Sequence, residues 1–265
     1  MQTDIHFQTH HLAQVYDAIA HKFSQTRSKY QHTAELKEIC QTLNSFSFES
    51  KKNIRILELG CWDGRLYSYL KIHCRHSLDY TGVDISHSMI QLADQSHPDV
   101  SRVVDEMNHY LSTIDPMSYD VIVSIATYQH LATDVHRSIH MHLCYQVLTY
   151  DGICVMTNRS WSKRMLKKYI RIYVISILKR IISWGYRSDR NDMEIPFIIN
   201  HQSLSRYYHI LTLCELKSFF VQAWFVISKK WYLDTQGILT SYRWNAKNTF
   251  IVAHKKIHDT CKSEL

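Results

Sequence analysis

The chain has 265 residues, of which 45% are hydrophobic and 12% aromatic, and its formal net charge is +7. A chain of this length and composition can bury the full core of one α/β domain with elaborations. It contains no apolar run of about 18 residues, and its polar start lacks the basic-then-apolar order of a signal peptide. We therefore expect a soluble, cytoplasmic protein without a membrane-spanning segment.

Cysteine and histidine patterns argue against disulfides and metals. The seven cysteines are scattered from Cys40 to Cys261 and form no C-x-x-C pair, which fits reduced thiols better than a disulfide framework. Among the eighteen histidines, His136 and His140 share a helix face, but no H-E-x-x-H motif accompanies them. We expect no metal site, and a solvated helix face is the default for this pair.

Short apolar strands alternate with amphipathic segments, which is the βαβ pattern of a parallel sheet. The expected helices are Leu12–Phe23, Ala34–Leu43, Leu66–Leu70, Val135–Leu148 and Leu211–Phe220. The expected strands are Ile54–Leu59, Tyr80–Val83, Ser101–Val104, Tyr119–Ile125, Gly152–Thr157, Ala223–Tyr232 and Thr249–His254, with the last two able to pair as a terminal hairpin. Because no repeat or low-complexity linker interrupts the pattern, we expect a single domain.

The most informative stretch is Leu57–Arg65, with the sequence LELGCWDGR, in which an apolar strand runs into a glycine turn. Two of only six glycines, Gly60 and Gly64, bracket this turn, where the backbone can approach a ligand. The next strand ends on Asp84, at the separation from the turn where an acidic side chain meets ribose hydroxyls in dinucleotide-type folds. The turn thus indicates an adenosyl cofactor, and an ordinary tight βα turn is the alternative.

The order of these parts resembles the class I S-adenosylmethionine-dependent methyltransferases over residues 33–160 and 203–255. This resemblance implies a Rossmann-like α/β fold with a mostly parallel seven-stranded sheet, helices on both faces and an inserted basic helix. The expected divisions are an N-terminal cofactor-closing helix and loop (1–32), a cofactor-binding core (33–159), a basic helical insertion (160–202), a C-terminal helix and strand hairpin (203–256) and a tail (257–265).

A narrower resemblance is to the tRNA wobble-uridine carboxymethyl O-methyltransferases and their bacterial relatives. The segments that carry it are Val15–Ala20, Phe23–Arg27, Ser124–Leu131, Glu194–Phe197 and Arg206–His209. The chain departs from that family at Trp62, where Gly is usual, at Gln129, where a second His is usual, and at Tyr150–Gly152, where Pro-Gly-Gly is usual. We expect the Trp62 side chain to point outward from the turn.

The class resemblance implies S-adenosylmethionine as the cofactor. It implies that Gly60 and Gly64 line the methionine moiety, that Asp84 holds the ribose hydroxyls, and that Asp105 with Ile125 borders the adenine. A strand-end turn is the alternative role of Asp105.

Further cofactor contacts are expected from both sides of the turn. Glu58 and Asp84 make the surroundings of the cationic sulfonium acidic, although Glu58 can also serve only to orient the turn. Arg27 and Tyr30 are expected to close over the cofactor from the N-terminal segment, with Arg27 pairing with the methionine carboxylate.

The expected acceptor group, by the narrower resemblance, is a carboxylate, which is ionised at neutral pH and needs cationic or hydroxyl donors rather than a general base. Arg206, Tyr207 and His209 are the candidates to hold it, and His130 lies just past the fourth strand, where ligands bind in such sheets. A helix-edge cluster with aromatic packing is the alternative for the 206–209 run.

Residues 160–190 contain nine Lys or Arg and one acidic residue, so their +8 exceeds the chain total of +7 and the remainder sums to −1. An amphipathic helix is expected there, with an apolar face through Leu166, Ile170, Tyr173, Val174, Ile177 and Ile181. The candidate RNA-binding residues are Arg164, Lys167, Lys168 and Arg171. Contact with an anionic membrane surface and a merely solvated face are the alternatives.

These observations predict a methyltransferase acting on a carboxymethyl group of a tRNA wobble uridine. A methyltransferase for a small-molecule acid or hydroxyl acceptor is the main alternative, and a non-catalytic cofactor-binding scaffold is the second. The expected partners are tRNA and, by the narrower resemblance, a small activating protein subunit.

Overall fold

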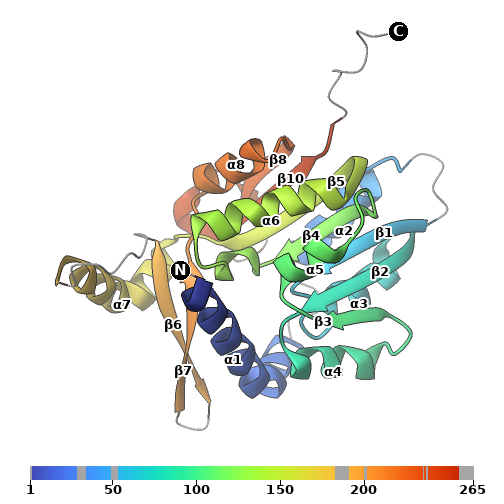
Figure 1. The fold of residues 1–265 in the computed structure, drawn as a ribbon. Coiled ribbons are helices and arrows are strands. Elements are labelled where there is room, and N and C mark those ends of the chain that lie inside the picture. The colour runs from blue at the N-terminus through green and yellow to red at the C-terminus, as the bar shows by residue number, and fades with distance from the viewer. Residues whose placement is uncertain are drawn as a thin grey trace.

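The computed structural model describes residues 2–28, 34–48, 53–182, 191–199, 202–234, 236 and 238–256. The fold has three layers, a twisted central sheet with helices on each face (Figure 1). The helices are α1 Gln2–Ser28, α2 Ala34–Ser45, α3 Arg65–His73, α4 His87–Ser96, α5 Met107–Thr113, α6 Asp134–Val147, α7 Lys163–Ile182 and α8 Leu213–Gln222, with short 3₁₀ turns η1 Tyr128–His130 and η2 Arg243–Asn245.

The central sheet has the strand order β3-β2-β1-β4-β5-β10-β8-β9. Its strands are β1 Asn53–Leu59, β2 Ser77–Asp84, β3 Ser101–Val104, β4 Tyr119–Ile125, β5 Leu148–Arg159, β8 Val226–Asp234, β9 Leu239–Thr240 and β10 Ala246–His254. Strands β1 to β5 are parallel, and β10 runs antiparallel to both β5 and β8. The Rossmann-like, mostly parallel sheet and its terminal hairpin are confirmed, whereas the expected seven strands become eight because the two-residue β9 pairs with β8.

Two hydrophobic clusters fix the layers on either side of the sheet. On one face, α5, α6 and α8 pack on side chains that alternate along the strands, such as Leu57, Ile122 and Cys154. On the other face, α2 and α3 cover the intervening side chains, such as Ile56 and Val121. Because both faces are covered, the central strands are mostly apolar, and all seven residues of β4 are buried, including Asp120 and Ser124.

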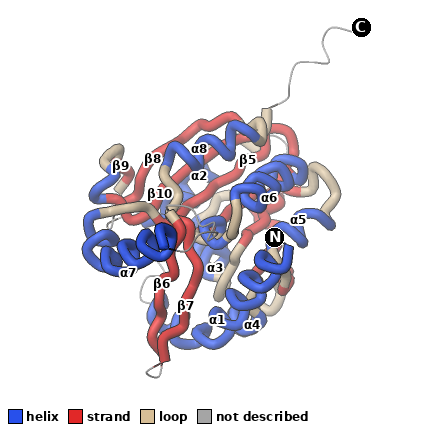
Figure 2. The backbone as a smooth tube through the Cα atoms, turned by 60° about the vertical axis from the view of Figure 1, so that its left-hand side comes forward, coloured by secondary structure: helices blue, strands red, loops and turns tan. Residues whose placement is uncertain are grey.

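A second, two-stranded sheet lies outside the central one. It is the hairpin of β6 Asp192–Ile199 and β7 Gln202–His209, in which Ile195 pairs with Arg206. The sequence pattern predicts no strands here, although Glu194–Phe197 and Arg206–His209 are among the segments that carry the narrower resemblance. The hairpin crosses the expected division between residues 160–202 and 203–256, and it lies between α1 and α7 (Figure 2).

Helix α7 forms as expected, but a different face packs. Met165 and Tyr169 are buried against Met193, Ile195 and Tyr208 of the hairpin. The predicted apolar face is correct only in part, because Leu166 and Tyr173 pack against this cluster whereas Ile170 and Val174 are exposed. The buried face is thus rotated by roughly a quarter turn from the predicted one, and the side chain of Ile181 lies outside the described residues. Sequence periodicity cannot decide between two adjacent apolar faces, because the choice depends on what the hairpin offers for packing. Within the described residues, no helix is long and apolar enough to cross a membrane.

Candidate functional site

A cavity lies at the carboxyl ends of the parallel strands, beneath helix α1. It is next to the point where the strand order reverses between β1 and β4, which is where open α/β sheets bind ligands. Six segments of the chain line it: α1, the turn after β1, the end of β2, the residues after β3, η1 with the residues around it, and the first turn of α6. The lining residues are Gln8, Thr9, Leu12, Tyr16, Gly60, Trp62, Val83, Asp84, Ile85, Asp105, Glu106, Met107, Thr127, His130, Leu131, Ala132 and His136.

Gly60 is required by both conformation and space. Its φ is +78°, and a Cβ added to it would lie 2.1 Å from Oγ1 of Thr127. Its N–H donates to the carbonyl of Val83 at 2.7 Å, which ties the turn to β2. Gly64 also has a left-handed φ, +76°, but it begins α3 and is absent from the cavity lining. Of the two predicted glycines, the structure therefore brings only Gly60 to the cavity.

Trp62 does not point outward, so that expectation was wrong. Its ring lines the cavity and meets Phe23 of α1 edge-on, with ring centroids 5.0 Å apart. The guanidinium carbon of Arg65 lies 4.5 Å from the Trp62 ring centroid. Trp62 itself has φ +52°, a conformation that side chains rarely adopt, and the packing against α1 offsets that strain.

Asp84 is buried at the end of β2 and lines the cavity. Its Oδ2 accepts the N–H of Trp62 and its Oδ1 accepts the N–H of Ser86, each at 2.9 Å. Burial raises the pKa of Asp84 to about 6, although these two amides oppose the shift. Each oxygen keeps a lone pair, so the carboxylate can accept two further hydrogen bonds, as two ribose hydroxyls would require.

Asp105 follows β3 and also lines the cavity. Its carboxylate accepts from the N–H of Glu106 at 2.7 Å and from Nδ1 of His109 at 2.8 Å. Ile125, predicted beside it at the adenine, is buried at the end of β4 and is absent from the lining, where Thr127 stands instead.

Glu58 lies under the glycine turn and is absent from the cavity lining. It is buried, and the Tyr80 hydroxyl donates to its Oε2. Burial raises the pKa of Glu58 to about 8, so this carboxyl is mostly neutral at pH 7. The expectation that it adds negative charge around the cofactor therefore fails, because desolvation outweighs the hydrogen bond from Tyr80. Its alternative role, orienting the turn, fits its position.

His130 lies in η1 and lines the cavity. Its Nδ1 lies 2.8 Å from the carbonyl of Tyr207, which only accepts, so Nδ1 carries the proton. Its Nε2 consequently accepts from the Tyr16 hydroxyl at 3.1 Å. Burial lowers the pKa of His130 to about 3, which leaves a neutral imidazole at the cavity wall.

Arg206 lies behind Tyr16 and outside the cavity lining. Its guanidinium carbon is 5.2 Å from the ring centroid of Phe197, 5.4 Å from that of Tyr208 and 5.7 Å from that of Tyr16. The residue is 7% exposed, and its buried Nε has no hydrogen-bond partner among the described residues. A cation is thus held in an aromatic cage, one ring away from the cavity.

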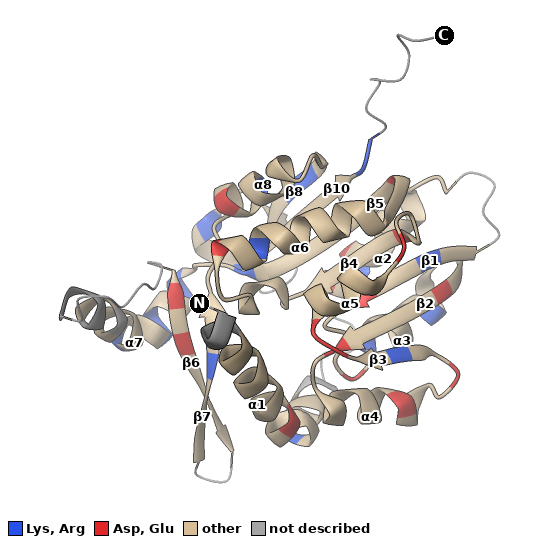
Figure 3. Cartoon of the chain, in the orientation of Figure 1, with Lys and Arg blue, Asp and Glu red and all other residues tan. Residues whose placement is uncertain are grey.

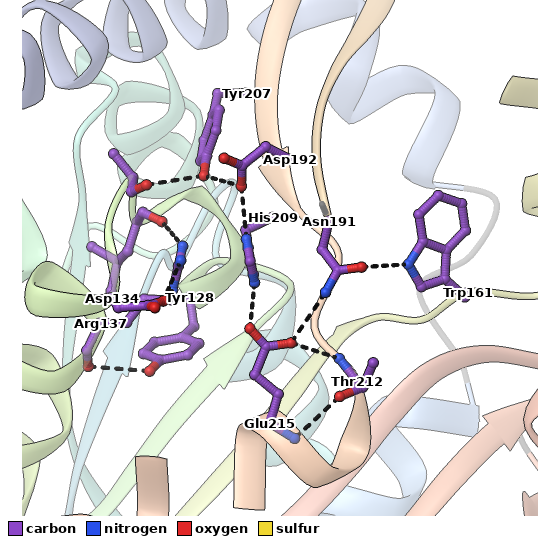
Figure 4. A network of polar contacts seen from close by, with 12 residues as sticks. Tyr128, Asp134, Arg137, Trp161, Asn191, Asp192, Tyr207, His209, Thr212 and Glu215 are labelled. Carbon is purple, nitrogen blue, oxygen red and sulfur yellow. Dashed lines mark hydrogen bonds and ion pairs between the residues drawn. The ribbon is translucent and has the colours of Figure 1, made fainter. Parts of the chain in front are cut away.

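Tyr207 and His209 belong to a buried polar network rather than to the cavity lining (Figure 4). The Tyr207 hydroxyl and the Nδ1 of His209 both lie 2.7 Å from Oδ1 of Asp192. The other ring nitrogen of His209 lies 2.6 Å from Glu215, which also completes the capping box of α8 with Thr212. The side chains of these two residues therefore have other partners than Arg206 and His130, and Tyr207 meets His130 only through its backbone carbonyl, although all four were predicted to act together.

The remaining predicted residues fall in two groups. The backbone of Arg27 lies in α1 but its side chain is not described, and Tyr30 lies outside the described residues. Arg164, Lys167, Lys168 and Arg171 are all exposed on α7.

Among the residues that the structure describes, no group of three His, Cys, Asp or Glu side chains could hold a metal ion.

Sequence reasoning missed three residues at the cavity. Tyr16 and Trp62 line it, and Asp17 fastens α1 by accepting from the Ser86 hydroxyl at 2.7 Å and from the Ser88 N–H at 2.9 Å. The signal was present for two of them, because Tyr16 and Asp17 stand in the Val15–Ala20 segment that carries the narrower resemblance. Thr127, which fills the space over Gly60, also stands in a segment of that resemblance, Ser124–Leu131, but it was not singled out as a site residue.

The fold and the cavity define a Rossmann-like protein of the class I methyltransferase architecture. Residues 57–154 match the family model described as a methyltransferase domain. This segment contains the glycine turn, Asp84, Asp105 and His130, and it ends within β5. Residues 57–154 therefore form a methyltransferase domain within this fold.

Similarity to individual proteins extends the comparison. Over 136 residues the chain is 31% identical to the malonyl-[acyl-carrier protein] O-methyltransferase 1 of Ilyobacter polytropus. The matched segment covers 49% of this chain and 47%, about half, of that protein. The putative methyltransferase in complex with the Haloferax volcanii Trm112 methyltransferase activator matches with a TM-score of 0.62 at 12% identity, covering 93% of this chain and 98% of that one.

A third similar protein is the Burkholderia thailandensis 1,6-didemethyltoxoflavin-N1-methyltransferase, solved with bound 1,6-didemethyltoxoflavin and S-adenosylhomocysteine. It matches with a TM-score of 0.59 at 14% identity, covering 96% of this chain and 91% of that one. At such identities the two structures establish the shared fold.

Proposed function

We propose that this chain is an S-adenosylmethionine-dependent methyltransferase whose acceptor atom is a carboxylate oxygen. The cavity fits the cofactor in two respects. Gly60, at its wall, has no side chain of its own, and Asp84 presents two oxygens with spare lone pairs. When bound, S-adenosylmethionine supplies a methyl group on a cationic sulfur. The acceptor is proposed from the residues on the other side of the cavity.

The observation that carries the acceptor class is the buried Arg206. Its guanidinium sits among the rings of Tyr16, Phe197 and Tyr208, and its Nε has no partner among the described residues. A buried cation without an opposing charge is costly, and an incoming carboxylate would remove that cost. Because Tyr16 lies between Arg206 and the cavity, a change of its rotamer or a small shift of α1 would bring the acceptor to the guanidinium.

His130 supports the same acceptor class for a different reason. Methyl transfer is a displacement at carbon, so the protein must align the acceptor and exclude water. A carboxylate is already ionised at neutral pH, whereas a hydroxyl or ammonium acceptor must lose a proton to a base. With its pKa near 3, His130 is a weak base, and its Nε2 already accepts from Tyr16. We assign it to orienting Tyr16 before the acceptor enters.

The tRNA wobble uridine is one acceptor that presents such a group, in the form of its carboxymethyl substituent. Its support is the sequence resemblance, together with the four exposed cations of α7 that could meet phosphates. The similarity to a methyltransferase in complex with its activator supports, for this chain also, a small activating subunit.

A malonyl thioester on a carrier protein is the second candidate acceptor. The name of the Ilyobacter polytropus relative favours it, and a malonyl group carries a free carboxylate, as the tRNA substituent does. Arg206 would serve either acceptor in the same way. A free small-molecule acid remains the third source of this chemistry, and a cofactor-binding scaffold without turnover is the contrary hypothesis.

The test combines cofactor binding with methyl transfer. Calorimetry measures S-adenosylmethionine affinity, and labelled methyl transfer is then followed to total tRNA, to a malonyl-loaded carrier protein and to a set of small carboxylic acids. Arg206→Gln is expected to keep cofactor affinity and lower kcat/KM by about a hundredfold or more, the scale of losing a charged hydrogen bond to the reacting group. Arg159→Gln, at a half-buried position on β5, is the matched control.

Each result discriminates between hypotheses. Transfer to one acceptor, lost in Arg206→Gln and retained in Arg159→Gln, supports the proposal and identifies the acceptor. Unchanged kcat/KM in Arg206→Gln would remove Arg206 from the site. Binding with no transfer to any acceptor, in the presence of candidate activators, would favour the scaffold.

A further inference from the structure

Helix α7 presents two kinds of side chain to solvent. Its inner face, which includes Met165 and Tyr169, packs on the β6–β7 hairpin. The exposed cations stand in its first half, and the exposed aliphatic side chains lie from the middle to the far end: Ile170 at 41%, Val174 at 45%, Ile175 at 53% and Leu178 at 49% exposure. Together, the exposed residues Arg164, Lys167, Lys168, Ile170, Arg171, Val174, Ile175 and Leu178 form what we call the outer face of α7.

The aliphatic part of the outer face is unusual for a surface that only meets water. Single exposed aliphatic residues are ordinary, but four within nine positions of one helix form a contiguous apolar strip. The inner face already supplies the packing that holds α7 on the hairpin, so these four side chains are not needed for the fold. Their exposure indicates a partner that accepts apolar groups.

The charge of α7 restricts that partner further. Its twenty residues contain seven Lys or Arg and no Asp or Glu. Figure 3 shows blue and no red along the described part of the helix. A partner with a dense negative surface is attracted by this helix, and a neutral apolar one gains nothing from the cations.

An anionic membrane surface satisfies both requirements at once. Lipid phosphates meet the Lys and Arg side chains, and the boundary between headgroups and acyl chains takes up aliphatic side chains to a shallow depth. An RNA backbone satisfies only the requirement for negative charge, because its phosphates and riboses would leave Val174, Ile175 and Leu178 exposed to water. The aliphatic strip therefore decides between two partners that the cations alone would fit equally well.

The position of α7 makes such docking compatible with catalysis. The hairpin lies between α7 and α1, and α1 covers the cavity (Figures 1 and 2). A surface that holds the outer face of α7 therefore leaves the cavity cover untouched.

We propose that the outer face of α7 docks the protein on an anionic membrane surface, with its cations on lipid phosphates and its aliphatic strip in the interface. This inference concerns where the protein binds and does not rest on Arg206 or on the carboxylate class of the acceptor. It does assign to lipid the α7 cations that would otherwise support tRNA as the acceptor.

The test uses the full chain and vesicles of two compositions, phosphatidylcholine alone and phosphatidylcholine mixed with phosphatidylglycerol. Co-sedimentation is expected with the mixed vesicles only, and it should weaken as salt is raised. The triple variant Val174→Gln, Ile175→Gln and Leu178→Gln is expected to bind them about tenfold or more weakly, since the lost aliphatic groups supply the apolar part of the affinity. The matched control replaces three exposed aliphatic residues elsewhere, Ile72, Val135 and Ile139, with Gln.

The charges are tested in parallel. Lys167→Glu, Lys168→Glu and Arg171→Glu together should abolish vesicle binding, whereas reversal of three exposed lysines elsewhere, Lys37, Lys71 and Lys217, should weaken it far less. Circular dichroism melting checks each variant, and where the glutamine triple melts early, single Leu178→Gln is compared with single Val135→Gln.

Three outcomes would overturn the proposal. One is vesicle binding that is unaffected by the glutamine triple, and another is equal binding to vesicles of pure phosphatidylcholine. The third is the absence of vesicle binding, including the case in which the chain binds total tRNA and loses that affinity only in the charge variant. That last result would show that the outer face of α7 binds RNA rather than a membrane.

Discussion

The Nε2 atom of His209 lies 2.6 Å from Oε1 of Glu215, while its Nδ1 lies 2.7 Å from Oδ1 of Asp192. One buried imidazole therefore joins the hairpin, which carries Arg206, to the first turn of α8. Both ring nitrogens face carboxylates, so the ring is held as an imidazolium. Burial opposes that charge, but the hydrogen bonds that the ring donates to both carboxylates prevail and raise the pKa of His209.

His209→Gln is expected to lower the unfolding free energy by about 3 kcal/mol, the scale of breaking a buried ion pair. The wild-type contribution is fully present below the ordinary histidine pKa of 6.5 and is lost as pH rises through the raised folded value. On the acidic side, the Glu215 contribution is lost as pH falls through its lowered pKa. Urea unfolding at a series of pH values measures the loss of unfolding free energy on both the alkaline and the acidic side. His142→Gln on α6 is the control, and an identical alkaline slope in wild type and His209→Gln would contradict the assignment.

Cofactor affinity is expected to fall with acidity because of Asp84. Its pKa of about 6 means that below this pH a proton occupies an oxygen that ribose hydroxyls need. The dissociation constant for S-adenosylmethionine should rise by about tenfold for each pH unit below 6 and stay level above it. Calorimetry at a series of pH values checks this. Asp84→Asn should bind weakly without that dependence, and a pH dependence that persists in the variant would assign it to another group.

Gly60 and Gly64 allow a matched comparison of strain and space. Both have left-handed φ values, so Ala at either position costs about 1–2 kcal/mol of unfolding free energy. At Gly60 the new Cβ also meets Thr127 at 2.1 Å, whereas at Gly64 its nearest neighbour is Ala93 Cβ at 3.3 Å. Gly60→Ala should therefore cost about 1–3 kcal/mol more than Gly64→Ala in denaturant unfolding. Thr127→Gly should remove that difference, and equal losses in the two single variants would refute the steric argument.

Trp62→Gly is expected to loosen α1 with little change in global stability. Glycine relieves the strain of φ +52°, but Phe23 loses its ring contact under α1. Hydrogen exchange should show faster exchange in α1, and S-adenosylmethionine affinity should fall because Trp62 lines the cavity. Trp224→Gly is the control, since Trp224 has φ +63° and is exposed far from α1 in sequence and packing. Unchanged exchange in α1 would show that Trp62 does not fasten it.

Several elements followed from the sequence because their causes are local. Strand β4 was predicted at its observed bounds, since five of its seven residues are apolar, which suits a strand covered on both faces. Gly60 and Asp84 were predicted as cavity residues, and the structure brings both to the lining. Backbone conformation and strand ends can be predicted from the sequence, because they depend on near neighbours.

The misjudged residues depend on partners far away in the chain. Glu58 stands next to the glycine turn, but its neutral state follows from burial and from Tyr80, twenty-two residues on. Trp62 turns inward because Phe23 of α1 packs against it. His209 was grouped with Arg206 as a site residue because the two are close in sequence, yet they lie three residues apart on strand β7, so their side chains point to opposite faces.

The fold class, the glycine turn and an adenosyl cofactor could be predicted from the amino-acid sequence, because hydrophobic periodicity, the paired glycines and the acidic strand end are features of short segments. Which of the candidate residues share one cavity depends on the tertiary structure. In the folded chain Tyr16 and Trp62 line the cavity, and Arg206 lies outside it among aromatic rings. His209 belongs to a buried polar network, and the aliphatic strip of α7 is exposed. Each of these outcomes depends on packing between segments that are distant in the chain, and hydrophobic burial, rather than local propensity, sets that packing.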